Sequence, residues 1–186
     1  MTQDRYSSVA IVLHWAIAIL LVTNVGLAWY ANALEGAARG GVMNLHKPLG
    51  IVILLLTAAR VMWRLARRPP PLSPALKPWE RTLARIVHVG FYVVLLALPL
   101  SGWAMVSGGP RPIDMFGLFD WPTMSFLAGQ PKAVGEALAE THHLLAKAIV
   151  YVLIPLHILG ALKHQFLDKD DTLARMIPFL ARRPGH

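Results

Sequence analysis

Four long apolar segments constrain this chain more than any other feature. They cover residues 6–30, 46–64, 83–106 and 140–166. A helix needs about 20 mostly apolar residues to cross the hydrocarbon core of a bilayer, and each segment is close to or above that length. Only 15% of the 186 residues are charged, and the mean hydropathy is +0.50. We therefore predict an all-α protein, a four-helix transmembrane bundle that forms a single domain over residues 1–186.

The basic residues predict how this bundle is oriented. Five of the 18 lysines and arginines lie towards one side of the membrane: Arg39, Lys47, Arg111, Lys132 and Lys147. The other thirteen lie towards the opposite side: Arg5, Arg60, Arg64, Arg67, Arg68, Lys77, Arg81, Arg85, Lys163, Lys169, Arg175, Arg182 and Arg183. The positive-inside rule places the richer side, and with it both termini, in the cytoplasm. Topology thus accounts for the net charge of +8, and we expect no nucleic-acid partner.

The connectors between the spans differ in character. The segment 67–82 is rich in proline, which removes helical hydrogen-bond donors, and we expect it not to be helical. The longer segment 107–132 carries Phe116, Phe119 and Trp121, which suits a loop at the membrane interface.

The first span imitates a secretory signal peptide, because Ala31-Asn32-Ala33 follows its apolar run. That run is longer than a typical signal peptide core and contains His14 and Trp15. We therefore expect it to remain as the first span.

Histidines within the apolar segments are the strongest functional signal. His143 and His157 are 14 residues apart. In a regular helix that is nearly four turns, so both imidazoles project from almost the same face, about 21 Å apart. His142 falls about 60° away from His157 by the same arithmetic, and we expect it to face the periplasmic loop.

Each of these two histidines has a predicted partner at its own depth. His46 opens the second span on the side of His143, and His14 lies in the first span at a depth similar to that of His157. Two imidazoles at one level of a helix bundle can hold a haem iron axially. The chain has no cysteine, which excludes the covalent attachment of c-type haem and leaves b-type haem. We predict two haems, held by the pairs His14/His157 and His46/His143.

Two other roles are open to these histidines: hydrogen bonds between helices, and proton or metal transport. Polar side chains in membranes also hydrogen-bond between helices and stabilise the bundle. Intramembrane histidines also serve proton or metal transporters, but zinc prefers three or four ligands that converge on one point. Two separated pairs favour haem.

Three more residues are candidates for contacts near the cytoplasmic pair. Arg60 and Arg64 lie one turn apart in the second span and suit haem propionates or an anionic substrate, whereas headgroup contact is the alternative. His88 in the third span could compete with His14 as a ligand, bond a propionate, line a quinone pocket or join two helices.

Three stretches of the sequence resemble the bacterial cytochrome b561 family, which is grouped with the cytochrome b subunits of nickel–iron hydrogenases. They read RYSSVAIVLHW, LHKPLGIVILLLTAARVMWRL and HLLAKAIVYVLIPLHILGALKHQFLDKDDTLARMIP. The resemblance implies a multi-pass protein of the bacterial inner membrane with two b haems. The family's ligand positions fall on His14, His46, His143 and His157, and His88 lies outside the usual axial set.

The resemblance also implies transmembrane electron transfer. Family members commonly exchange electrons with ubiquinone or another quinone, and one proposed activity is the oxidation of superoxide. We expect an electron carrier or a quinone-linked oxidoreductase. The alternative is a haem-bearing anchor subunit of a dehydrogenase or hydrogenase. The sequence has no glycine-rich nucleotide fingerprint, so its donor and acceptor must be lipid-soluble, small or carried by a redox partner protein.

Overall fold

The structure is a computed structural model that describes residues 6–67, 70–71, 76–170 and 172–177. Three long helices come first, α1 (Ser8–Asn32), α2 (Gly36–Ala66) and α3 (Pro78–Ser107). A fourth rod follows, built from α4 (Lys132–Ala148), η2 (Ile149–Leu153), α5 (Ile154–Lys163) and η3 (His164–Asp168). All four rods are long and apolar enough to span a membrane. The predicted all-α membrane bundle is confirmed.

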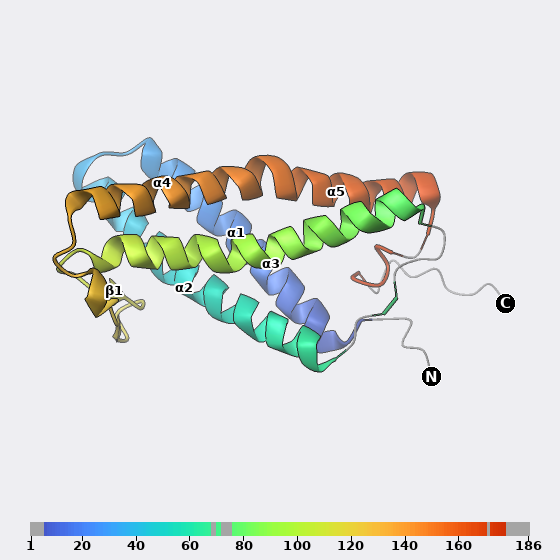
Figure 1. Ribbon diagram of the computed structural model, residues 1–186, viewed down its shortest axis with the longest axis horizontal. Helices are drawn as coiled ribbons and strands as arrows, with labels where there is room; N and C mark the ends of the chain where they lie inside the picture. Colours follow the sequence, from blue (N-terminus) through green and yellow to red (C-terminus); the bar gives the residue numbers. More distant parts are fainter. Residues whose placement is uncertain (1–5, 68–69, 72–75, 171, 178–186) are drawn as a thin grey trace.

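The four rods pack in chain order, α1 on α2, α2 on α3 and α3 on α4 (Figure 1). Aliphatic side chains fill the middle of the bundle, and the buried members are Ile17, Leu21, Ile53, Leu95 and Ile149. Large apolar side chains such as Val22, Met62 and Leu159 are more than half exposed on the outside of the bundle. In a bilayer these outer side chains face lipid, and the helices satisfy their own backbone hydrogen bonds.

The start and the end of the described chain meet at one end of the bundle. The indole Nε1 of Trp15 donates to the carbonyl oxygen of Met176 at 3.0 Å, and that of Trp63 donates to Ser7 Oγ at 3.0 Å. This end therefore gathers the start of α1, the end of α2 and the segment after η3. Arg5, Arg68, Arg182 and Arg183, which the orientation argument used, lie outside the described residues.

Helix boundaries extend beyond the predicted spans. Helix α2 begins ten residues before the predicted start at 46, and the fourth rod begins at Lys132. Helix α3 begins at Pro78, inside the connector that we expected not to be helical. Proline is tolerated there because the first helical N–H needs no partner within the helix, and Glu80 accepts the N–H of Lys77 at 2.9 Å. The rest of this connector lies partly outside the described residues.

A small β-hairpin covers the opposite end of the bundle. Its strands are β1 (Ile113–Asp114) and β2 (Asp120–Trp121), and the 3-10 turn η1 (Ser125–Leu127) follows. Ile113 and Met115 are buried with Ile51 of α2. The Trp103 indole donates to the Pro122 carbonyl oxygen at 2.8 Å, so the segment that we predicted as an interfacial loop is tied to the helices.

The fourth rod is irregular in its middle. Residues Ile149–Leu153 form a π turn, in which the Ile154 N–H donates to the Ile149 carbonyl five residues earlier. Pro155 explains the distortion, because a proline lacks the N–H for the carbonyl four residues earlier and its ring collides with that carbonyl. A π turn adds one residue to the helix, so residues on its two sides no longer follow a regular helical register.

Candidate functional site

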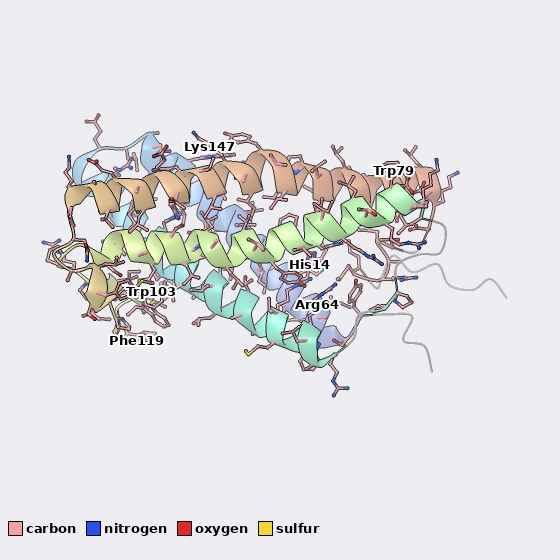
Figure 2. The ribbon with its side chains drawn as sticks, in the orientation of Figure 1. His14, Arg64, Trp79, Trp103, Phe119 and Lys147 are labelled. Carbon is pink, nitrogen blue, oxygen red and sulfur yellow. The ribbon has the colours of Figure 1, made fainter. Side chains whose placement is uncertain are left out.

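Three histidines meet at the end of the bundle where the described chain starts and ends. The rings of His14 on α1 and His157 on α5 have their centroids 6.0 Å apart, at an interplanar angle of 66°. The ring centroid of His88 on α3 lies 5.7 Å from that of His157. Figure 2 shows His14 and Arg64 in the half of the bundle away from β1. The structure thus brings the predicted pair His14/His157 together and adds His88 to the same group.

Arginines from α2 border this first cluster. Arg60 donates through Nε to the Tyr92 hydroxyl at 3.4 Å and through Nη1 to the Ala10 carbonyl at 3.2 Å. The Arg64 guanidinium lies 5.6 Å from the centroid of the Tyr92 ring, within the range of a cation–π contact. Two cations at one level of the second span therefore stand beside the histidines, where an anionic group would find a counter-charge.

A second group of histidines lies at the hairpin end. The His46 ring on α2 faces His142 on α4, with centroids 6.3 Å apart at 85°. His143 lies 6.1 Å from His142 and is exposed. The sequence predicted His143 opposite His46, and the structure differs by bringing the neighbouring residue His142 there. The cause is the π turn, which the regular-helix arithmetic did not include.

Backbone carbonyls fix the rings of His46 and His142. His46 Nδ1 lies 3.1 Å from the Asn24 carbonyl oxygen, and His142 Nδ1 lies 2.9 Å from the Leu98 carbonyl oxygen. A carbonyl oxygen only accepts, so in each ring the Nδ1–H is the donor and Nε2 carries the free lone pair. Ser101 Oγ adds a contact of 3.2 Å to His142 Nδ1. This arrangement is typical of metal-ligating histidines.

The spacing of the rings at both ends fits a metal between them. An imidazole nitrogen binds a metal at about 2 Å, so two imidazoles on opposite sides of one ion have ring centroids roughly 6 Å apart. The centroid distances of 6.0 Å and 6.3 Å both agree with this expectation, as does the 5.7 Å between His88 and His157. Within the described residues, neither pair has a cysteine or carboxylate beside it that would complete a zinc site. The two donor sets therefore suit the axial positions of b-type haem.

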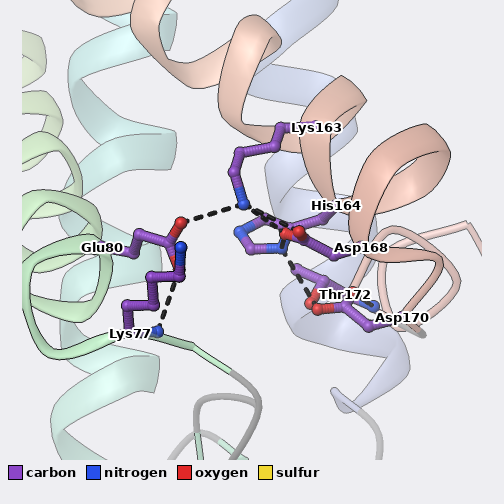
Figure 3. Close-up of polar contacts among 7 residues, drawn as sticks. All are labelled: Lys77, Glu80, Lys163, His164, Asp168, Asp170 and Thr172. Carbon is purple, nitrogen blue, oxygen red and sulfur yellow. Dashed lines mark hydrogen bonds and ion pairs between the residues drawn. The ribbon is translucent and has the colours of Figure 1, made fainter.

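The end of the bundle with the first histidine cluster also carries an ion-pair cluster that sequence reasoning missed (Figure 3). Lys163 Nζ lies 3.0 Å from Glu80 Oε1 and 2.6 Å from Asp168 Oδ2, so it joins the fourth rod to α3. His164 Nδ1 lies 3.0 Å from Asp168 and 3.1 Å from Asp170. The available signal was the four-residue spacing of His164 and Asp168, which places them on one helix face.

The same cluster holds the carboxyl group of Asp170 in its charged form. Burial acts to raise the pKa of Asp170, but hydrogen bonds from Thr172 and the neighbouring His164 outweigh it, and the pKa lies below its ordinary value. The donor atoms of His164, Asp168 and Asp170 lie within 4.8 Å of one another. Because Lys163 already neutralises Asp168, we assign these groups to an ion-pair network that fastens the end of the fourth rod.

Comparison with known proteins gives one family and several relatives. Residues 5–179 match the family described as prokaryotic cytochrome b561. The chain is 35% identical to cytochrome b561 homolog 2 of Escherichia coli K12, over 95% of this chain and 93% of that protein. It is 31% identical to the probable superoxide oxidase CybB of Yersinia pestis, over 95% and 97% of the two chains. Cytochrome b562 of Cereibacter sphaeroides is 27% identical, over 95% of this chain and 98% of that protein.

Proposed function

The chain belongs to the prokaryotic cytochrome b561 family, and on this basis we propose that it carries electrons through two b haems, one at each histidine cluster, to or from a quinone. The family membership itself makes the protein a haem-based electron-transfer protein of the bacterial inner membrane. It works within the lipid bilayer with a redox partner. The number of haems, the quinone and the donor belong to the proposal.

One observation carries the proposal of two haems. Imidazole pairs with centroid distances of 6.0 Å and 6.3 Å lie at opposite ends of the bundle, on different pairs of helices. At the cytoplasmic-side end we propose His14 and His157 as axial ligands, with His88 as a neighbour that touches propionate or quinone. At the hairpin end we propose His46 together with one of the adjacent His142 and His143. The predicted pair His46/His143 stays a prediction here.

The chain's own residues have defined tasks in this proposal. When bound, haem supplies the one-electron chemistry of its iron. The histidines bind and orient it, and the carbonyls of Asn24 and Leu98 hold two of the rings by their Nδ1–H groups. Aliphatic side chains between the clusters exclude water. Arg60 and Arg64 provide positive charge for propionates or an anionic substrate.

The proposed donor follows from the name of one relative, and the proposed orientation follows from the distribution of basic residues. The name of the Yersinia pestis relative contains probable superoxide oxidase, and we propose the same class of reaction for this chain. Two superoxide ions each lose one electron and become dioxygen, and one quinone takes up two electrons and two protons. We further propose that the end with the termini and the Lys163 cluster is cytoplasmic, as the distribution of basic residues predicts.

Spectroscopy of the purified full-length protein tests the haem proposal. After expression with ample haem supply, we expect a dithionite-reduced minus oxidised spectrum of b type and two haems per chain by pyridine haemochrome. One haem per chain would contradict the proposal of two. No haem would contradict the assignment of both clusters and favour a histidine-based transporter instead.

Electron exchange tests the quinone part separately. In proteoliposomes we expect superoxide to reduce the bound haem and added ubiquinone to reoxidise it. Protein with two haems that exchanges electrons with neither ubiquinone nor ubiquinol would refute the quinone linkage. Such a result would favour the anchor subunit, for which a co-purifying catalytic subunit is the direct observation.

A further inference from the structure

We propose that His142, and not its neighbour His143, is the axial haem ligand opposite His46. The inference rests on the proposed haem function and deepens it. It departs from the position that the family pattern indicates, and it follows from the π turn in the fourth rod. Three features of the structure point to His142: the helix register, the hydrogen bonds of its ring and the space that α3 leaves for it.

The register changes because the π turn lies between the two histidine clusters. His142 precedes His157 by 15 residues, and the extra residue in Ile149–Leu153 reduces this to about 14 in a regular helix. At about 100° per residue, His142 then projects within about 40° of His157, whereas His143 projects about 140° away. The same arithmetic on an unbroken helix gives the opposite choice. The π turn therefore decides which of the two histidines projects on the side of His157.

The ring of His142 is held in the way that a ligand requires. Its Nδ1–H donates to the Leu98 carbonyl at 2.9 Å, and Ser101 Oγ lies 3.2 Å away. Nε2 is left with its free lone pair, and the Nδ1 of His46 is likewise fixed by the Asn24 carbonyl at 3.1 Å. The ring centroids are 6.3 Å apart. Each imidazole thus has the outer hydrogen bond that orients a metal-binding ring and raises its basicity.

Helix α3 has a place for this ring. A Cβ atom on Gly102 would lie 2.9 Å from His142 Cε1 and 3.1 Å from its Nδ1. The first distance is shorter than real Cβ contacts and the second is unusually tight, so the ring in this position requires a residue without a side chain at 102. His143, in contrast, is exposed. A histidine that only joined two helices would need no more than the Leu98 hydrogen bond. Such a role gives no reason for the ring to approach His46.

Adjacent single substitutions in the full-length protein separate the two residues. We expect His142→Ala to bind one haem per chain and to lose one low-spin bis-imidazole signal by electron paramagnetic resonance. The matched control His143→Ala should retain both haems and both signals. The haem at His14 and His157 reports folding in each variant. Loss of a haem from His143→Ala alone, from both variants or from neither would overturn the assignment.

Methionine substitutions decide the case where His142→Ala does not insert into the membrane. Methionine is also an axial ligand and raises the reduction potential of a haem relative to bis-histidine ligation. We expect His142→Met to keep two haems with one midpoint potential raised, and His143→Met to leave both potentials unchanged. A raised potential in His143→Met, or unchanged potentials in His142→Met, would overturn the assignment. The unaltered protein keeps the two questions apart, because its haem content tests the proposed function alone.

Discussion

Substitution of Gly102 by alanine tests how closely the structure fixes the ring of His142. The new Cβ would lie 2.9 Å from His142 Cε1, whereas ordinary carbon–carbon contact begins at about 3.5 Å. The ring must therefore retreat by roughly 0.6 Å, and its 2.9 Å bond to the Leu98 carbonyl would stretch towards 3.5 Å, the limit of a hydrogen bond. Loss of such an outer hydrogen bond costs about 10- to 100-fold in metal affinity, which is about 1.4 to 2.7 kcal/mol.

Haem transfer to excess apomyoglobin measures this effect in purified protein. We expect Gly102→Ala to release one of its two haems about 10- to 100-fold faster than the unaltered chain and to keep the other. Gly26→Ala is the matched control, because it makes the same exchange within a membrane helix at a site where a Cβ meets nothing within 4 Å. Equal release from both variants would refute the argument that the backbone of α3 positions the ring.

Four further substitutions probe the first cluster and the ion-pair network. His157→Ala should lower the haem content from two to one per chain by pyridine haemochrome, and an unchanged content would refute the pair His14/His157. His88→Ala should retain both haems with altered turnover, and loss of a haem would make His88 the ligand. Arg60→Leu removes a cation beside the cluster, so redox titration should show one midpoint potential lowered, because positive charge stabilises the reduced haem. An unchanged potential would refute this electrostatic role of Arg60. Asp170 has a lowered pKa, so its charged form stabilises the folded protein. This stabilisation is full above the unfolded pKa of 3.8 and disappears as the pH falls through the folded pKa. The melting temperature of Asp170→Asn should therefore lie below that of the unaltered protein at pH 7, and the two should converge at acid pH.

Most of the fold is predictable from the sequence, because a bilayer permits few structures. A run of about 20 apolar residues can only be a helix there. Three predicted spans lie within helical rods, and the first begins two residues before α1. The helix ends were less predictable. Gly40 and Gly41 disfavour a helix, yet α2 runs through them, since propensity is a weak constraint that other interactions override.

The candidate site shows where helical periodicity alone does not predict which histidines face one another. Counting residues placed His14 level with His157, and the structure brings these rings together. Counting from His157 to His143 assumed an unbroken helix, and one π turn changes the residue that faces His46. Pro155 was the visible signal for an irregular helix, but a proline does not tell whether a helix kinks, ends or gains a residue. That choice depends on packing across the whole bundle.

The aliphatic layer between the two clusters has an electrical consequence. Its buried members are Ile17, Leu21, Ile53, Leu95 and Ile149, none of which can carry a proton. An electron that passed between the clusters, about 21 Å apart along the fourth rod, would cross this aliphatic layer. The electron would then carry its charge through part of the membrane field, and complete passage across the membrane costs or gains about 2.3 kcal/mol per electron for each 100 mV. The membrane potential would act directly on the direction and rate of electron flow.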